Sequence, residues 1–261
     1  MDAIDFDLSE FLRVCYAMLE LEYFRVSHDR TELYIRAVQP ALWLVLFGFI
    51  IGSLRAIPTG GIPYTAFIAP GVLIQSATTV AIFYGLMIVW ERESGILKRL
   101  LSTPAPRYVI VIGRALAAGM RALIQSLVIF LIAAIVGVKF VINPINFLIS
   151  LVIVLIFSAG FAAFSMSLAT VFKTREKFVG IGQLIIFPLF FSSNALYPLT
   201  TMPAFLQMFA YINPMTYAID ALRGLLITNN LTGLSTDIFA VILFTSIMFY
   251  IAAVRFKKIV E

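Results

Sequence analysis

The chain has few of the side chains that build redox, metal or acid-base sites. It has one cysteine, Cys15, and one histidine, His28, among 261 residues. An internal disulfide, a cysteine-rich metal site and a multi-histidine metal centre are therefore excluded. His28 lies in a polar stretch with no second titrating partner near it, so we expect a solvated bend residue rather than a proton switch.

The sequence also lacks the short motifs of common enzymes. It has no Gly-x-x-x-x-Gly-Lys-Ser/Thr phosphate loop, no Gly-x-Ser-x-Gly nucleophile turn and no His-Glu-x-x-His metal motif. Its apolar segments hold almost no acids or histidines of the kind that form proton relays. We therefore expect a chain that is not an enzyme and binds no cofactor of its own.

Charge is scarce and apolar residues dominate. Charged residues make up 13% of the chain, about half the share usual in soluble domains, and 61% is hydrophobic, with a mean hydropathy of +1.00. This composition predicts an all-α integral membrane protein. Six apolar segments are long enough to cross a hydrocarbon layer of ~30 Å. They cover residues 37–54, 65–90, 115–138, 147–172, 178–196 and 238–254.

Residues 1–36 are expected to form a cytosolic amphipathic interface helix and a bend, ahead of the six-span membrane domain at 37–261. The helix is predicted over 7–24, with Asp7 and Glu10 as a capping pair. Glu22 interrupts its apolar face, so incomplete burial is expected. That face holds Leu8, Phe11, Leu12, Cys15, Met18 and Leu19. The polar stretch 27–32 predicts the bend.

Several residues within the spans carry structural expectations. Pro40 is expected in the first turn of the first span, where proline costs least, and Pro70-Gly71 predicts a kink or local unwinding of the second. Arg121 is expected to extend to the membrane interface, so no buried ion pair is predicted for it. The small residues of the fourth span, from Ser158 to Ser167, predict close helix packing.

The segment 197–237 differs from the spans. It contains several prolines and two apolar pieces, 204–211 and 215–227, each too short to cross a membrane. We expect them to enter the outer leaflet and return. Asp220 and Arg223 lie three residues apart on the second piece, so they are expected to form an outer ion pair. A structural role is favoured over a substrate contact.

The basic residues predict the orientation. Fifteen of the 19 lysines and arginines lie in the N-terminal segment, in the loops after the second and fourth spans, and at the C-terminus. Positive residues favour the cytosolic side. Both termini and the loop at 91–114 are therefore expected in the cytosol of a prokaryote, with the chain in its plasma membrane. The distribution of charge matters more than the formal total of +5: the basic residues gather in the segments expected on the cytosolic side, and no nucleic-acid partner is expected.

The loop at 91–114 is the longest charged interruption between spans. Ile96, Leu97, Leu100 and Leu101 fall on one apolar stripe of a short predicted helix, with charges opposite. Thr103 and Pro104 predict the start of the following helix. The stripe needs a packing partner. A separate protein is favoured, and lipid headgroups are the alternative.

The segment from Glu91 to Pro104, Glu-Arg-Glu-x-Gly-x-Leu-Lys-Arg-Leu-Leu-Ser-Thr-Pro, resembles the coupling segment of type-2 ATP-binding-cassette exporter permeases. That group includes daunorubicin, nodulation-factor and polysaccharide export subunits. Further similarities, spread in the same order over nearly the whole chain, are Gln39-Pro40, Pro70-Gly71, Tyr197-Pro198-Leu199, Asn213-Pro214-Met215-Thr216-Tyr217 and Ala221-Leu222-Arg223.

The resemblance implies a permease that dimerises and binds two separate ATPase subunits, which hold the ATP and magnesium. Its expected cargo is a drug-like molecule, a lipid or a lipid-linked glycan. The implied ATPase-coupling residues are Glu91, Arg92, Glu93, Gly95, Ile96, Leu97, Lys98, Arg99, Leu100 and Leu101. The N-terminal helix shares this coupling role.

Polar residues of the second and fifth spans are the candidates for the translocation path at a dimer seam. They are Gln75, Thr78, Thr79, Gln183, Ser192 and Asn194. The alternative is that they satisfy one another inside each bundle. A non-transporting structural or assembly subunit of a larger complex stays open as a second function. A membrane enzyme would need clustered acids, histidines or a nucleophile, which these spans do not offer.

Overall fold

The computed structural model describes residues 8–54, 57–96, 107–141, 143–172 and 174–256, which form helices joined by short turns, with no strand. The prediction of an all-helical membrane protein is confirmed. The long helices are α1 (Leu8–His28), α2 (Arg30–Leu54), α3 (Tyr64–Glu93), α5 (Arg107–Ile135), α6 (Pro144–Val171), α7 (Arg175–Phe191) and α10 (Leu234–Phe256). The short ones are η1 (Leu199–Thr201), α8 (Ala204–Ile212), α9 (Pro214–Arg223) and the π-helical turn η2 (Gly224–Thr228).

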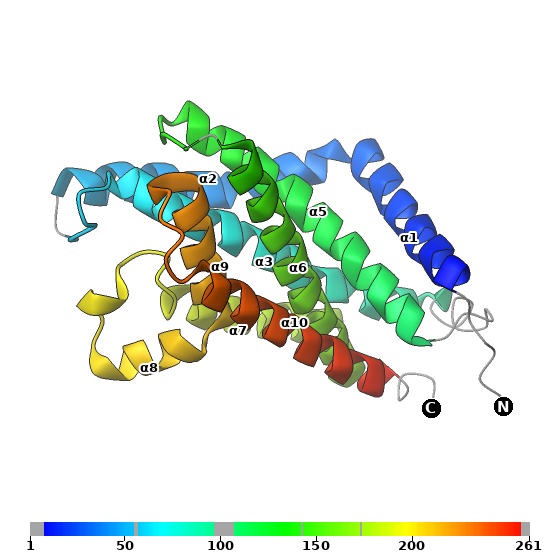
Figure 1. Ribbon diagram of the computed structural model, residues 1–261. Coiled ribbons are helices and arrows are strands. Elements are labelled where there is room, and N and C mark those ends of the chain that lie inside the picture. The colour runs from blue at the N-terminus through cyan, green and yellow to red at the C-terminus, as the bar shows by residue number, and fades with distance from the viewer. Residues whose placement is uncertain (1–7, 55–56, 97–106, 142, 173, 257–261) are drawn as a thin grey trace.

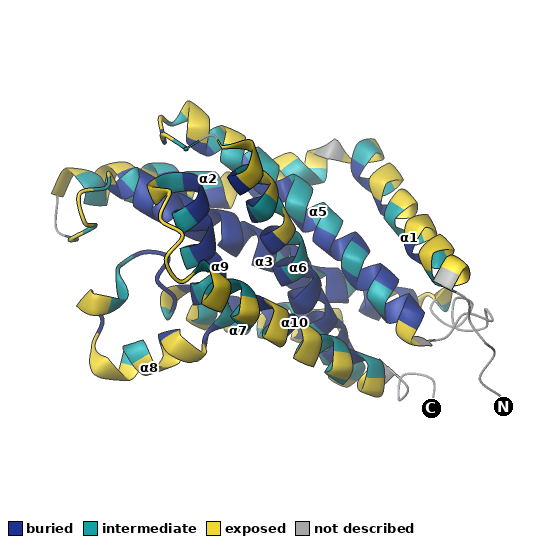
Figure 2. Cartoon of the chain, in the orientation of Figure 1, coloured by how far each residue is buried: buried dark blue, intermediate teal, exposed yellow. Residues whose placement is uncertain are grey.

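Helix α3 is the centre of the bundle. Its sequence is apolar on every side, and a helix of this kind is stable only when it is surrounded. It packs against α2, α5, α6, α7 and α9, and it is buried along nearly its whole length (Figures 1 and 2). The site described below is built around the end of this helix.

Five of the described helices have the length and apolar composition to cross a membrane. They are Thr31–Leu54, Tyr64–Glu93, Tyr108–Ile135, Pro144–Val171 and Leu234–Arg255. The sixth predicted span, 178–196, corresponds to α7, which ends at Phe191 and has 17 residues. At ~1.5 Å per residue, α7 rises about 26 Å, short of the ~30 Å hydrocarbon layer. A crossing by α7 therefore stays a prediction.

The outer helices turn large apolar side chains away from the bundle. Leu46 and Phe49 of α2 and Phe239 and Tyr250 of α10 are exposed, and Figure 2 shows exposed residues along the outer sides of α1, α8 and α10. Apolar surface of this extent is typical of a chain surrounded by lipid or by a partner subunit. The burial pattern therefore agrees with the membrane spans.

Small residues allow α3 to approach its neighbours. A Cβ atom on Gly71 would lie 2.7 Å from the Cβ of Ala195, so α3 packs directly on the turn that follows α7. A Cβ on Gly85 would lie 2.8 Å from the carbonyl oxygen of Ser165 in α6. The predicted close packing of the fourth span is confirmed. The predicted unwinding at Pro70 is not found, since α3 is helical through this residue.

The predicted bend at 27–32 is narrower than expected. Helix α1 continues to His28, and only Asp29 separates it from α2. The Oδ1 of Asp29 accepts a hydrogen bond from the backbone N–H of Glu32 at 3.3 Å, which caps α2. Because α2 begins at Arg30, Pro40 lies inside the helix and not in its first turn. That prediction was wrong.

The two short helices expected within 197–237 are present as α8 and α9. Asn213 joins them: its Oδ1 caps α9 by accepting from the N–H of Met215 at 2.9 Å, and its Nδ2 donates to the carbonyl of Leu189 at 2.6 Å. One asparagine thus fixes the angle between α8 and α9 and ties both to α7. Whether they re-enter a membrane stays a prediction.

In Figure 1 the first described turn of α1, the start of α5 and the last turn of α10 lie at one end of the bundle. The turn that leads into α3 and the π-helical turn lie at the other end (Figure 1). We call the first the charged end, because it holds Glu91, Arg92, Glu93, Arg114 and Arg175.

Candidate functional site

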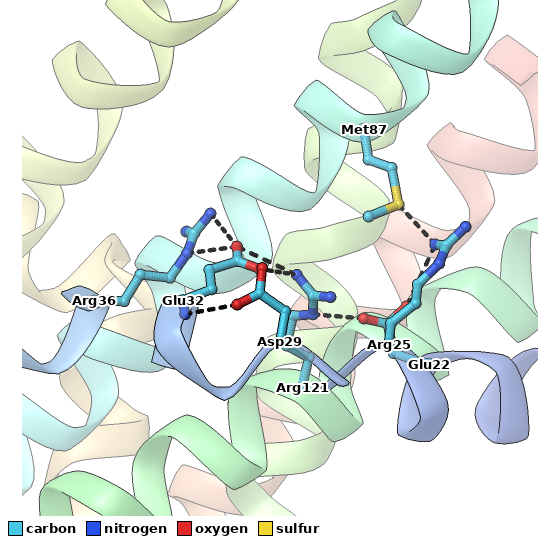
Figure 3. Close-up of polar contacts among 7 residues, drawn as sticks. All are labelled: Glu22, Arg25, Asp29, Glu32, Arg36, Met87 and Arg121. Atoms are coloured by element: carbon cyan, nitrogen blue, oxygen red, sulfur yellow. Dashed lines mark hydrogen bonds and ion pairs between the residues drawn. The ribbon is translucent and has the colours of Figure 1, made fainter. Parts of the chain in front are cut away.

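Arg121 is buried in an ion-pair cluster that joins α1, α2 and α5 (Figure 3). Its Nε lies 2.5 Å from Glu22 Oε1, and its Nη1 lies 3.2 Å from Glu32 Oε2. Glu32 also pairs with Arg36 at 2.7 Å, and Glu22 lies 3.7 Å from Arg25. We call Glu22, Arg25, Glu32, Arg36 and Arg121 the Arg121 cluster.

Burial makes the Glu22–Arg121 pair the strongest part of this cluster. The side chains of Glu22 and Arg121 are 1% and 13% exposed. Removing one partner of such a pair leaves a buried charge and costs ~3–5 kcal/mol. The expectation that Arg121 reaches the interface without an ion pair was therefore wrong. Glu22, which interrupts the apolar face of α1, is the residue that fixes α1 to α5.

The remainder of the contact between α1 and α5 is apolar. Cys15 is buried, and a Cβ on Gly113 of α5 would lie 2.6 Å from the sulfur of Met18. Burial raises the pKa of the Cys15 thiol above its ordinary value. Leu12, which was predicted on this face, is exposed instead. The packed face of α1 is therefore rotated from the predicted one so that it includes Glu22.

The last turn of α3 is bonded to three other helices. Glu91 pairs with Arg114 of α5 at 2.6 Å, and both side chains are buried. Arg92 donates to the carbonyls of Ala169 and Phe172 at the end of α6, at 3.0 and 3.3 Å. Glu93 pairs with Arg175 of α7 at 2.5 Å. We call these the α3 terminal contacts. They fix the start of the predicted coupling segment to α5, α6 and α7.

The coupling segment leaves α3 through a glycine. Gly95 has a φ of +75°, which favours glycine, and Ile96 beyond it is exposed. Leu97, Lys98, Arg99, Leu100 and Leu101, together with Thr103 and Pro104, lie outside the described residues. Their predicted role in binding an ATPase stays a prediction. Glu91 and Arg92, predicted with them, already have partners within the chain.

An open pocket of about 270 Å³ lies beside the Arg121 cluster, with α3 as its floor and residues of α2, α5 and α7 around it. Three arginines and one carboxylate contribute the charge: Arg36, Arg121, Arg175 and Glu32. The remaining lining residues are Val80, Phe83, Tyr84, Leu86, Met87 and Trp90. The pocket thus combines guanidinium groups with an apolar floor.

The predicted path residues divide between the core and the surface. Gln75 and Thr78 are buried within the single chain, and the hydroxyl of Thr78 donates to the carbonyl of Ile74 at 2.8 Å. The amide of Gln75 donates to Thr79 one turn along, at 3.3 Å. Gln183 is exposed on α7. Their role in translocation stays a prediction.

The predicted pair Asp220–Arg223 is present, with 2.9 Å between Asp220 Oδ1 and Arg223 Nη1. Nη2 of Arg223 donates to the carbonyl of Asn194 at 2.7 Å, and its guanidinium lies 4.1 Å from the ring centre of Phe67. Burial raises the pKa of Asp220, opposed by the charge of Arg223. Burial also lowers the pKa of Arg223 to about 10. The pair joins α9 to α3 and to the turn after α7.

Asn194, predicted to line the path, contacts this outer pair, and Ser192, also predicted there, contacts Asn213 instead. Asn194 Nδ2 donates to Asp220 Oδ1 at 2.5 Å, and Ser192 accepts from Asn213 Nδ2 at 3.1 Å. Their observed contacts are structural. Sequence analysis did not predict the partners of Glu22, Glu91 and Asn194. The only signal in the sequence was that each is a charged or amide side chain within an apolar stretch.

The comparisons with known proteins agree with one another. The sequence matches the ABC-2 type transporter family over residues 13–227. It is 30% identical over 224 residues to the "Putative transport permease ycf38" of Cyanophora paradoxa, covering 82% of this chain and 74% of that protein.

Two further relatives are similar over most of their length. "Nodulation protein J" of Rhizobium leguminosarum bv. trifolii is 24% identical over 222 residues, covering 84% of this chain and 83% of its own. The "Probable doxorubicin resistance ABC transporter permease protein DrrC" of Mycobacterium tuberculosis is 28% identical over 200 residues, covering 77% and 72%. The family resemblance carried by the motifs is confirmed.

Proposed function

The chain belongs to the ABC-2 type transporter family, and we propose that it is the membrane permease of an exporter driven by separate ATPase subunits. Members of this family are transporter permease subunits that normally work with an ABC ATPase. In this proposal ATP and magnesium are held by the partner. The permease contributes the membrane path and the surface on which the ATPase acts.

The α3 terminal contacts are the observation that supports this coupling most directly. Glu91, Arg92 and Glu93 bond the last turn of α3 to α5, α6 and α7, immediately before the segment 96–101. A displacement of that segment by an ATPase would therefore move four helices together. The Glu91–Arg114 pair among them is buried, so separating it would leave unpaired charges.

Helix α1 gives the ATPase a second point of action. It begins at the charged end (Figure 1), and the Glu22–Arg121 pair fixes it to the middle of α5. Since the positive residues concentrate at this end, we place both termini and the coupling segment in the cytosol, and the chain in the plasma membrane of a prokaryote.

We further propose that two copies form the path. Gln183 is a polar residue on the exposed side of α7, beside exposed Leu184 and Phe187. A polar side chain on a surface that would otherwise face membrane hydrocarbon is stabilised when a partner subunit covers it. In this arrangement Gln183 lies at the seam, and Gln75 and Thr79 lie one layer behind it. The relative named for doxorubicin resistance supports a drug-like cargo. A lipid or lipid-linked glycan cargo is the alternative that the family resemblance implies.

Co-purification with a co-expressed ABC ATPase subunit tests the proposal. Leu100→Asp places a charge on the apolar stripe, so we expect the ATPase to be lost while the permease still inserts into membranes. Leu231→Asp is the matched control, because Leu231 is an exposed leucine in the turn between η2 and α10, away from the coupling segment in sequence. Equal recovery of the ATPase with both variants would overturn the proposal.

A further inference from the structure

The pocket beside the Arg121 cluster lies between α2 and α7. Both helices pack on α3, and they meet where Trp43 contacts Phe190, with 5.1 Å between ring centres. Nearer the charged end the pocket of about 270 Å³ opens between them. It is lined by α3 below and by residues of α2, α5 and α7 around it.

The floor of the pocket is an apolar stripe of α3. Val80, Phe83, Met87 and Trp90 recur at spacings of three and four, so they lie on one face of the helix. The stripe extends about 15 Å along the helix axis, at ~1.5 Å per residue. This length suits the first part of an alkyl or isoprenyl chain.

The charges around the stripe are mostly positive. Arg36, Arg121 and Arg175 line the pocket against one carboxylate, Glu32. The guanidinium of Arg175 lies 5.3 Å from the ring centre of Trp90, and that of Arg36 lies 5.9 Å from the ring centre of Phe83. The two cationic groups are therefore held over the two ends of the aromatic floor.

These arginines keep donors beyond their ion pairs. The described contacts of Arg36 with Glu32 use Nε and Nη2, and those of Arg175 with Glu93 also use Nε and Nη2. A guanidinium has five N–H donors, and its fork suits phosphate and carboxylate oxygens. Both arginine side chains are partly exposed.

We infer that this pocket binds an amphiphile with an anionic head: the head pairs with Arg175 beside Trp90, and the apolar chain lies along Val80, Phe83 and Met87. Arg36 adds positive charge farther along the stripe. Helices α2 and α3 beside the pocket have the length and composition of membrane spans, so in this proposal the ligand enters from the lipid. This assignment concerns binding by the permease alone. The lipid assignment can fail while the ATPase proposal stands, and the ATPase proposal can fail while the lipid assignment stands.

The chain provides its own reporter. It has two tryptophans, Trp43 and Trp90, so Trp43→Phe leaves Trp90 in the pocket as the single tryptophan, which can be excited selectively over the tyrosines. The purified variant is reconstituted into phosphatidylcholine vesicles that contain either brominated phosphatidic acid or brominated phosphatidylcholine. Quenching of Trp90 is normalised to the same lipid without bromine. We expect phosphatidic acid to quench Trp90 at a lower mole fraction than phosphatidylcholine.

Arg175→Gln in the same background tests the site. Its pair with Glu93 is exposed, so the fold should persist, and we expect the affinity for phosphatidic acid to fall about tenfold, equivalent to ~1.4 kcal/mol. Lys177→Gln is the matched control, because Lys177 is an exposed cation on the same helix that does not line the pocket. It should leave quenching unchanged.

Inorganic phosphate distinguishes binding of a lipid with an anionic headgroup from binding of a free anion. Added at millimolar concentration it should not relieve quenching by brominated phosphatidic acid, because it lacks the chain that contacts α3. The inference is overturned if the two lipids quench Trp90 equally, if Arg175→Gln behaves like Lys177→Gln, or if phosphate displaces the lipid.

Discussion

Replacing Arg121 by glutamine tests whether the buried Glu22–Arg121 pair holds α1 on the bundle. Glu22 is 1% exposed and lies 2.5 Å from Arg121, so the variant leaves a buried carboxylate whose nearest described cation is Arg25 at 3.7 Å. Loss of one partner of a buried pair costs ~3–5 kcal/mol. Because Arg25 compensates in part, we expect the lower end of this range.

The only cysteine of the chain reports this change directly. Cys15 is 6% exposed and lies on the face of α1 that packs on α5. A membrane-permeant maleimide can reach it only when α1 undocks. When reclosing is faster than labelling, the rate follows the undocked population. A loss of ~3 kcal/mol then raises the labelling rate about a hundredfold, at tenfold per ~1.4 kcal/mol.

Two controls make the measurement specific. Arg175→Gln removes an exposed pair, with side chains 48% and 39% exposed, which is worth ~0.2–1 kcal/mol, so labelling should rise less than about sixfold. The double variant Glu22→Gln with Arg121→Gln leaves no buried charge in the pair, so labelling should fall back toward the wild-type rate. If Arg121→Gln labels no faster than Arg175→Gln, the pair does not hold α1.

Four further predictions concern other parts of the chain. In the wild type, Cys15 labelling should still increase with pH above its ordinary pKa of 9.0, because burial raises the pKa of the thiol; a plateau at pH 9 would contradict this. Glu91→Gln leaves Arg114 buried and unpaired, so the free energy of unfolding of the permease in detergent should fall by ~3–5 kcal/mol. The amount of cargo transported per ATP hydrolysed should also fall, even where the ATPase still binds. Gly71→Ala places a Cβ 2.7 Å from Ala195 and should cost ~1–3 kcal/mol in the same unfolding assay, whereas Gly180→Ala in α7 meets nothing within 4 Å and should be neutral or stabilising. Arg223→Gln should lower the unfolding midpoint strongly, and Arg223→Lys should not restore it, since a single ammonium cannot reproduce the separate bonds to Asp220 and Asn194 over the ring of Phe67; full rescue by lysine would show that charge alone matters.

The sequence was sufficient for the features that depend on composition and local spacing. Apolar runs of spanning length predicted the five long helices, because only helices satisfy the backbone in lipid. The pair Asp220–Arg223 followed from a three-residue spacing on one helix. The short helices at 204–212 and 214–223 followed from prolines and limited apolar length.

The site could not be read in the same way, because its contacts join residues far apart in the chain. Nothing local to Arg121 indicates that Glu22, on a separate helix, lies 2.5 Å away. The apolar run was expected to begin at Ala115, which placed Arg121 within reach of water, but α5 begins at Arg107 and Arg121 lies at its middle. Its burial is favoured because α1 supplies a carboxylate. Pro40 was misplaced for a related reason: the Glu32–Arg36 pair extends α2 by two turns before the apolar run begins.

The most direct test of the account is the sidedness of Ser94, an exposed residue one position beyond α3. In a Cys15→Ser background, Ser94→Cys is treated with a membrane-impermeant maleimide in inside-out and right-side-out vesicles, with and without the ATPase. The account predicts labelling only from the cytosolic face and protection when the ATPase is bound. Labelling from the outer face, or equal labelling with and without the ATPase, would contradict it.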